Sequence, residues 1–373
     1  MRALLLSLFA PAALLLASTC GWAFKLQPVG GEENPGAISD RQAAGFLRLF
    51  TSDVHERITR RAYEQAQVTL PADVMAGVRW NDNPPAVRLA PLFGGCQASD
   101  MRRGEQMDCW FSMLRVDRLA LETVMRREKS IAPLRSHFGD MQFLHAMAPR
   151  AEEPATRTLE KILRWCEFTY AVARGDIGPR VNVHGLRDSP LGLEPQTAAW
   201  VASLFGAPEK QLWRVGDIFL ARPGDLRLVA FGTLLHLVED SYSASHVRRE
   251  TLRAQANACP SYQAADAVVE FHTYAEQDTE KHALCDDPPD WLEVPREGSP
   301  VDVIAALVRA YHDGAGWPVV KRILEEDVFR LAERTHGARA GRCFERRAEI
   351  PDTEVVRAPP IMLDASCRNE ISP

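Results

Sequence analysis

The chain of 373 residues carries 44 basic and 50 acidic side chains, which gives a formal net charge of −6 at pH 7. The two signs are mixed roughly evenly, which excludes the basic footprint of a duplex nucleic-acid binder but leaves single strands and lipid surfaces open as partners. The length is sufficient for one large domain or two smaller ones with a substantial buried core.

The first 21 residues are predicted to be a secretory signal peptide. Arg2 precedes a long apolar run, and small residues follow up to Ala23, a pattern typical of export signals. Cleavage after Gly21 leaves Trp22 as the new N-terminus, whereas cleavage after Ala23 removes it. A lipoprotein signal ending at Cys20 is an alternative. We therefore expect a secreted or periplasmic protein.

In most of the remaining chain apolar residues recur at intervals of three and four residues, a spacing that predicts helices. Alternating strand patterns are scarce. The expected fold is mainly α, with a single helical domain over residues 22–340 and an irregular tail over 341–373. The predicted helices span residues 51–67, 115–130, 155–174, 196–205, 225–241, 264–284, 300–313 and 318–335.

The cysteines predict disulfide-tied loops. Of the eight cysteines, Cys20 leaves with the signal peptide, and an exported chain meets conditions in which disulfides form. Cys166 has apolar helical neighbours and is predicted to be a buried free thiol. The cysteines lack Cys-x2-Cys spacing, so we do not expect them to bind metal. Proximity in sequence suggests the pairs Cys96 with Cys109, Cys259 with Cys285, and Cys343 with Cys367.

A His-x3-Asp-x5-His pattern formed by His236, Asp240 and His246 is the main chemical signal in the sequence. A helix brings residues four apart onto one face, so His236 and Asp240 converge there, and His246 follows just after the helix. His272 and Glu276 are also four apart, within the predicted helix 264–284. Both pairs combine an imidazole with a carboxylate, which is a metal-ligand pattern.

Three further candidates lie earlier in the chain. His55 is in the first turn of a predicted helix, Asp82 is in a polar turn after Trp80, and His145 follows a leucine. Each alone has an ordinary structural explanation. Together with the two pairs they supply imidazole nitrogens and carboxylate oxygens, the ligand types that zinc and similar borderline metals prefer.

In this order the motifs resemble those of the zinc-dependent phospholipases C and the related single-strand-specific nucleases of fungi and plants. The resemblance implies a mainly α catalytic domain with disulfide-tied loops and three zinc ions. One zinc would be held by Asp82, His145, His236 and Asp240, and a second by His246, His272 and Glu276. Asp240 would bridge to a third zinc, completed by His55 and by the amino group and carbonyl of an N-terminal Trp22.

The second zinc site has an alternative register. The sequence around His272 can be shifted by four residues against the phospholipase pattern, which puts His272 at the glutamate position and Val268 at the histidine position. In that register Asp266, Asp278 or His282 would complete the site.

The resemblance implies a phospholipase C that cleaves phosphatidylcholine-like lipids at a membrane surface into diacylglycerol and a phosphorylated headgroup, by means of a zinc-activated hydroxide. Asp240 would bridge two ions, and Asp82 or a nearby carboxylate would accept the proton. We expect a monomer. A single-strand-specific zinc nuclease is the first alternative, and a secreted metal-binding structural protein without catalysis is the second.

Overall fold

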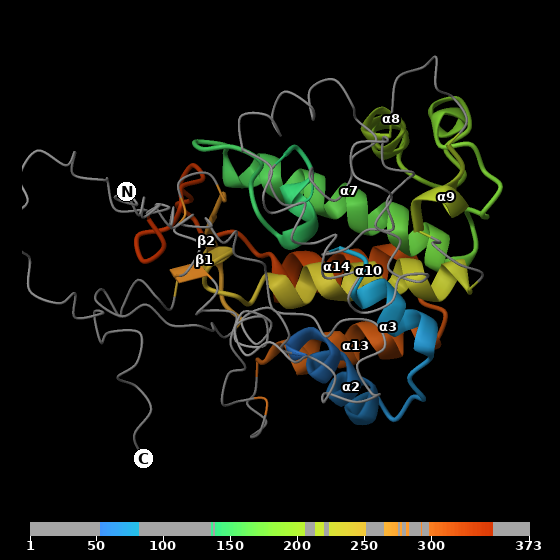
Figure 1. Ribbon diagram of the computed structural model, residues 1–373, viewed down its shortest axis with the longest axis horizontal. Coiled ribbons are helices and arrows are strands. Elements are labelled where there is room, and N and C mark those ends of the chain that lie inside the picture. Colours follow the sequence, from blue (N-terminus) through green and yellow to red (C-terminus); the bar gives the residue numbers. More distant parts are fainter. Residues whose placement is uncertain are drawn as a thin grey trace, which may run out of the picture.

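The computed structural model describes residues 53–81, 136, 139–205, 213–219, 224–250, 265–274, 277, 281–282, 292 and 298–345. Within these ranges the fold is mainly α, as predicted (Figure 1). The elements are, in chain order, α2 (Val54–Ala66), α3 (Ala72–Val78), η3 (Gln142–His145), α7 (Ala155–Arg174), η4 (His184–Arg187), α8 (Pro195–Leu204), α9 (Val215–Phe219), α10 (Leu226–Asp240), β1 (Val247–Arg249), β2 (Val268–Phe271), α13 (Pro300–His312), α14 (Trp317–Ile323) and η7 (Leu324–Val328).

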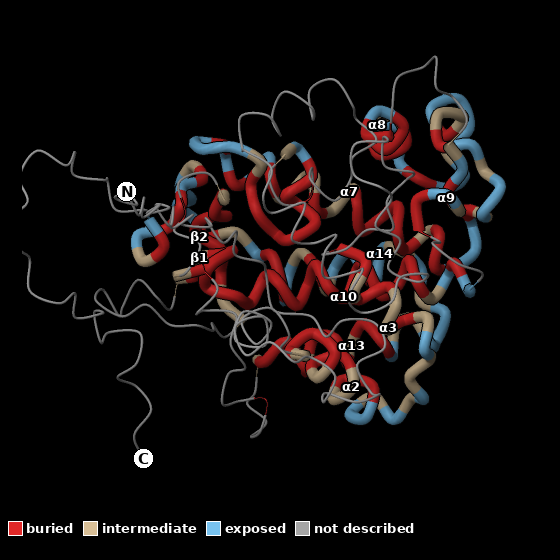
Figure 2. Tube along the Cα trace, viewed as in Figure 1, coloured by how far each residue is buried: buried red, intermediate tan, exposed pale blue. Residues whose placement is uncertain are grey.

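Helix α10 lies at the centre of the described fold. All of its residues except Arg227 and Leu228 are buried, and a helix that is apolar on every side belongs in the middle of a core. It packs against α7 on one side and against α3 and α13 on the other, and Figure 2 shows it buried along its length. The polar residues at its C-terminal end are therefore carried into the interior.

Two glycines let α3 and α10 approach each other more closely than other residues would allow. A methyl group added to Gly232 would lie 2.2 Å from the carbonyl oxygen of Val74 and 2.7 Å from the Cα of Gly77. The same addition to Gly77 would meet Gly232 Cα at 2.8 Å. This close crossing places the end of α3 beside the last turns of α10.

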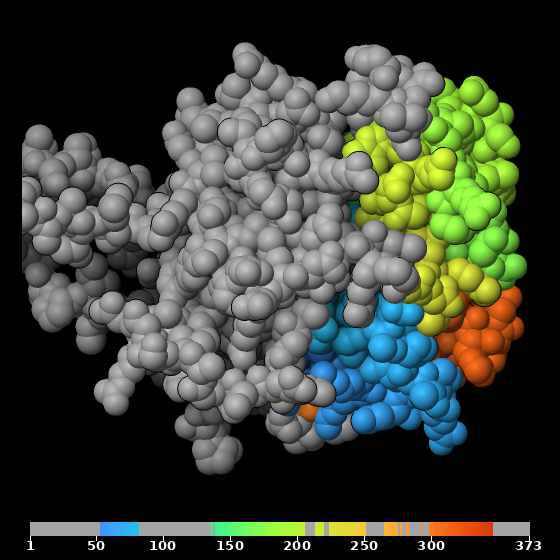
Figure 3. Space-filling model, turned by 45° about the vertical axis from the view of Figure 1, so that its right-hand side comes forward, coloured from blue at the N-terminus to red at the C-terminus, as the bar shows by residue number. Residues whose placement is uncertain are grey.

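The start of α10 is also tied to α3. The backbone amide of Asp225 donates to Asp73 Oδ2 at 2.9 Å, and the Asp225 side chain caps α10 by accepting from the amide of Arg227 at 3.0 Å. In the space-filling view the N-terminal helices lie against this part of the chain on one face of the molecule (Figure 3). The register between the two helices is thus fixed at both ends.

The predicted helix over residues 264–284 is wrong at its start. Residues Val268–Phe271 form strand β2, which pairs antiparallel with β1, with Val247 opposite Phe271. Val268 also forms a bridge with Leu331. The segment is rich in β-branched and aromatic residues, and backbone partners on both sides favour the extended form over an apolar spacing that also suits a helix.

Most of the predicted helices that fall within the described residues have nearly the expected bounds, whereas α3 and α9 lie where no helix was predicted. Helix α7 has the predicted bounds, α13 ends one residue early, and α8 and α10 differ from theirs by one residue at each end. The helix predicted over 318–335 stops early, because α14 passes into the π-helical turn η7 and ends at Val328. The helix predicted over 115–130, the signal peptide and the cysteines other than Cys166 and Cys343 lie outside the described residues. Cys166 is a buried free thiol, as predicted.

None of the described helices has the length and apolar composition needed to cross a membrane.

Candidate metal centre

The last turn of α10 provides the core of the site. His236 and Asp240 lie four apart, and His236 Nε2 is 3.0 Å from Asp240 Oδ2. The other ring nitrogen, His236 Nδ1, donates to the carbonyl oxygen of Val78 at 2.6 Å. Val78 follows Gly77, so the close glycine crossing brings this acceptor within reach. Because Nδ1–H is anchored in this way, Nε2 is the atom of His236 that faces the carboxylate, where it can bind a metal ion or donate a second ring proton to Asp240.

The short turn η3 adds His145 to this pair. His145 Nδ1 lies 2.8 Å from Asp240 Oδ2 and 3.4 Å from His236 Nε2. The turn is held to α10 by Asn81, whose amide donates to the carbonyl oxygens of Leu144 and Thr233 at 2.8 and 3.2 Å. Tetrahedral zinc with bonds of about 2.0–2.2 Å has ligand atoms about 3.3–3.6 Å apart. A small outward movement of these three groups would therefore admit an ion.

Helix α2 supplies His55 on the other side of Asp240. His55 Nε2 lies 3.4 Å from Asp240 Oδ1, and the His55 ring stacks on His236 with centroids 4.0 Å apart. His55 Nδ1 donates to Glu239 Oε2 at 2.7 Å. Asp240 therefore faces two groups of imidazoles, one through each carboxylate oxygen.

His246 and His282 form a stacked pair at the edge of the group. His246 Nδ1 donates to the carbonyl oxygen of His145 at 2.7 Å, and its ring lies 5.1 Å from that of His282. His282 Nδ1 lies 2.7 Å from Gln277 Oε1. The Gln277 amide nitrogen donates to the carbonyl oxygens of Ser245 and Ala340 at 2.8 and 2.6 Å, which identifies Oε1 as an acceptor. His282 therefore carries its proton on Nδ1 and presents Nε2.

His272 is buried but lies apart from the groups with ligand spacing. It follows strand β2, and its Nδ1 donates to the carbonyl oxygen of Ser245 at 3.1 Å. Its ring packs against Phe344, with centroids 5.9 Å apart, and against Gly341. Its predicted partner Glu276 lies outside the described residues. Of His272 and its alternative His282, it is His282 whose ring stacks on that of His246.

The site is a buried anion surrounded by imidazoles. Burial by itself raises the pKa of the Asp240 carboxyl, but the charges of His236 and His246 and hydrogen bonds from the imidazoles hold it well below its usual range. Burial lowers the pKa of His55, yet hydrogen bonds to Asp240 and Glu239 bring it well above the ordinary value. Asp240 is thus ionised at neutral pH, and the interior around it favours a bound cation.

Two further buried histidines, His272 and His282, are neutral at neutral pH. Burial lowers the pKa of His272 to about 3, and burial and the charge of His246 bring the pKa of His282 well below its ordinary value. A neutral imidazole is the form that binds a metal ion.

Among the residues that the structure describes, two buried sets could hold a metal ion. Each has ligand atoms within 4.8 Å of one another, namely His145, His236 and Asp240, and His55, His236 and Glu239. His55, His145, His236, Asp240 and His246 are thus brought together from distant parts of the chain. Asp82, Glu276 and Trp22, also predicted as ligands, lie outside the described residues.

Glu239 was not among the predicted residues, and His282 appeared only as an alternative. Glu239 is separated from His55 by 184 positions, so no local pattern reveals the contact. A signal for His282 was present in the sequence. His282 and Asp286 repeat the His-x3-Asp spacing of His236 and Asp240.

No protein-family model, curated protein or solved structure matches the chain. The chemistry of the residues in this site is therefore the basis on which a function can be assigned.

Proposed function

We propose that the protein is a zinc-dependent phosphodiester hydrolase, with phosphatidylcholine-like phospholipids as its substrate in a phospholipase C reaction. The observation that carries the metal-dependent chemistry is Asp240, a fully buried carboxylate whose two oxygens face different imidazoles. The choice of phospholipid rests on the resemblance in motif order.

The donor set fits zinc. Imidazole nitrogen and carboxylate oxygen are typical zinc ligands, and the Nδ1 atoms of His236, His246 and His282 are each held by an oxygen acceptor. His145, His236 and Asp240 Oδ2 would hold one ion, and Asp240 Oδ1 with His55 would contribute to another. We assign His282, rather than His272, as the partner of His246 in a third site, because their rings are stacked.

Bound zinc ions supply a nucleophilic water at neutral pH and offset the charge on the phosphate oxygens. The protein's own part is to keep the imidazoles in one tautomer and to keep Asp240 ionised. Asp82, which follows Asn81 in the sequence, or a nearby carboxylate is the proposed proton acceptor.

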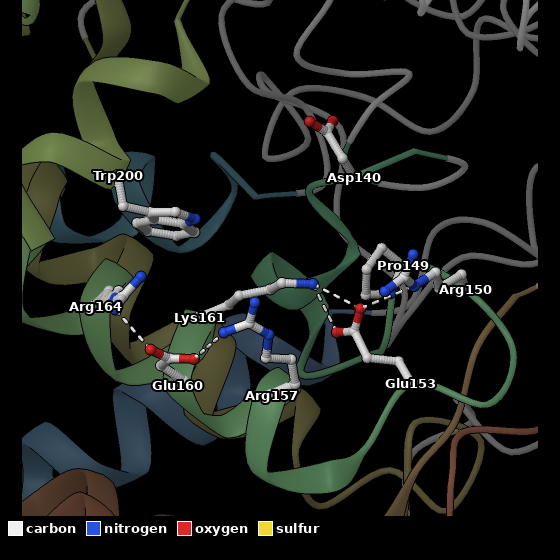
Figure 4. A pocket seen from close by; sticks show the side chains of 9 residues that line it. All are labelled: Asp140, Pro149, Arg150, Glu153, Arg157, Glu160, Lys161, Arg164 and Trp200. Carbon is white, nitrogen blue, oxygen red and sulfur yellow. Dashed lines mark hydrogen bonds and ion pairs between the residues drawn. The ribbon is translucent and has the colours of Figure 1, made fainter. Parts of the chain in front are cut away.

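A pocket of about 440 Å³ favours single-stranded nucleic acid as a second candidate substrate (Figure 4). Lys161 and Arg150 share Glu153, with distances of 2.6 and 3.5 Å, while Arg157 and Arg164 share Glu160 at 3.0 and 2.6 Å. Four cations against three carboxylates leave an excess of positive charge beside an indole ring. The lining residues are Asp140, Pro149, Arg150, Glu153, Arg157, Glu160, Lys161, Arg164 and Trp200.

Cations beside an aromatic platform are the features that bind single strands without sequence preference. The loop from residue 139 to 149 that borders this pocket also carries His145. By contrast, the large apolar side chains exposed in the described part of the chain are Leu191 and Val319, at 39% and 38%. The described surface therefore gives more support to the nuclease alternative than to a bilayer-docking rim.

The test is a parallel assay of the zinc-loaded protein on phosphatidylcholine vesicles and single-stranded DNA, with and without chelator. Asp240→Asn should lose bound zinc and hydrolysis together, whereas His312→Ala, which removes an exposed imidazole on α13, should retain both. Chelator-sensitive release of phosphocholine supports the phospholipase C, and nucleotide release supports the nuclease. About one tightly held zinc per chain with neither activity would refute catalysis and favour a structural metal protein.

A further inference from the structure

Glu239 is a fully buried carboxylate next to the centre of the metal site. Its Oε2 accepts from His55 Nδ1 at 2.7 Å, and its Oε1 accepts from the Thr59 hydroxyl at 2.6 Å. Thr59 is one turn after His55 on α2, so both donors come from the same helix face. All three side chains are completely buried. This is a closed hydrogen-bonded set that joins α2 to α10.

The geometry allows two roles for Glu239. Its oxygens lie close enough to His55 and His236 for it to be a metal ligand itself. Against this, each oxygen already accepts a short hydrogen bond, and the bond from His55 uses Nδ1. If Glu239 and His55 Nδ1 bound an ion together, His55 Nε2, which faces Asp240 Oδ1 at 3.4 Å, would not contribute to the ion that Asp240 holds.

The alternative is that Glu239 acts through His55. An ionised carboxylate can only accept, so the proton of a neutral His55 is fixed on Nδ1 and the lone pair on Nε2. Nε2 is the atom that faces Asp240 Oδ1, at 3.4 Å. Thr59 holds the carboxylate in the orientation that this requires. Such carboxylate–histidine contacts orient metal ligands and increase their basicity.

We propose that Glu239, held by Thr59, is a positioning residue that fixes the tautomer and orientation of His55 for metal binding, and is not a ligand. This inference rests on the metal site of the proposed function. It adds a residue that the motif order does not include, and it explains why a second carboxylate stands next to Asp240 in the interior.

The experiment uses the zinc-loaded full chain and compares Glu239→Gln with Glu239→Leu. A glutamine keeps an oxygen that accepts from His55 Nδ1, whereas leucine removes it. Chelator competition should show a loss of affinity of about 10–100-fold for one ion per chain in Glu239→Leu, with a smaller loss in Glu239→Gln. Nitrogen-15 NMR should show His55 protonated on Nδ1 in the wild type and in Glu239→Gln, but not in Glu239→Leu.

Other outcomes would overturn the proposal. If Glu239 were a ligand, Glu239→Gln would lose the ion as completely as Glu239→Leu. If its role were only structural, Glu239→Leu would lower the unfolding temperature but leave zinc affinity and the His55 tautomer unchanged. Should Glu239→Leu fail to fold, Thr59→Val replaces it, with Thr59→Ser as the rescue.

The proposed function can fail separately. A wild-type chain that binds no zinc refutes the metal site itself, whereas a wild-type chain that binds zinc together with a Glu239→Leu chain that binds it equally well refutes the positioning role alone.

Discussion

Replacing Gly232 by alanine should disrupt the metal site from a distance of one helical turn. The new methyl group would lie 2.2 Å from Val74 O, and ordinary contact begins at 3.4 Å, so α3 and α10 must separate by about 1.2 Å. The hydrogen bond from His236 Nδ1 to Val78 O, now 2.6 Å, would lengthen beyond the range of a good hydrogen bond. His236 would lose the contact that fixes its tautomer.

The energetic cost follows from the same contacts. Overpacking costs about 1–3 kcal/mol, and a buried acceptor left without its donor costs about 1–3 kcal/mol more. An alanine within a helix otherwise gains about 1 kcal/mol over glycine. The net loss of stability is therefore about 1–5 kcal/mol, opposite in sign to the usual effect of this substitution.

Denaturant unfolding with and without zinc, together with zinc affinity, would measure both effects of Gly232→Ala. The matched control is Gly178→Ala, because a methyl group at Gly178 would meet nothing within 4 Å. The control should have wild-type stability and zinc content. A Gly232→Ala protein that is as stable as the wild type and binds zinc equally well would refute the reasoning.

Three further predictions concern single residues. His282→Ala should lose one zinc ion per chain, whereas His272→Asn should keep all of its zinc. If only His272→Asn lost a zinc ion, His272 and not His282 would be the partner of His246. Because His272 has a pKa of about 3 when folded and about 6.5 when unfolded, it contributes stability above pH 6.5 that is lost as the pH falls towards 3. Between these two pH values the uptake of this one proton on unfolding adds about 1.4 kcal/mol per pH unit to the slope of the free energy of unfolding. This contribution should be absent from metal-free His272→Asn. Equal slopes in the metal-free wild type and the variant would contradict a buried, neutral His272. Trp200→Ala should reduce kcat/KM on single-stranded DNA by about 5–150-fold at unchanged zinc content, with Trp200→Phe close to wild type; an unchanged rate would remove the pocket from the substrate path.

The local parts of this structure could be predicted from sequence. Helix α7 has its predicted ends because apolar residues at helical spacing face one core and Gly175 ends the helix in the left-handed conformation. His236 and Asp240 converge because four residues span about one turn of α10. These features depend on neighbours in sequence.

The remaining features depend on distant partners. Val268–Phe271 has a spacing that suits either a helix or a strand, and pairing with β1 decides in favour of the strand. The contact between Glu239 and His55 depends on how α2 meets α10. The stacking of His282 on His246 depends on Gln277, which is itself held by two backbone carbonyl groups. Such contacts cannot be predicted from local sequence, because they form only when elements distant in the chain pack together.

Gln277 also has an evolutionary consequence. Its amide is oriented partly by the carbonyl oxygen of Ala340, a backbone group that any amino acid would provide. Gly341, by contrast, has φ +86° and lies against the His272 ring, where a methyl group would be 2.5 Å from the ring. Homologous sequences should therefore vary at position 340 only among side chains small enough for its buried place, keep glycine at 341, and change positions 277 and 282 only together.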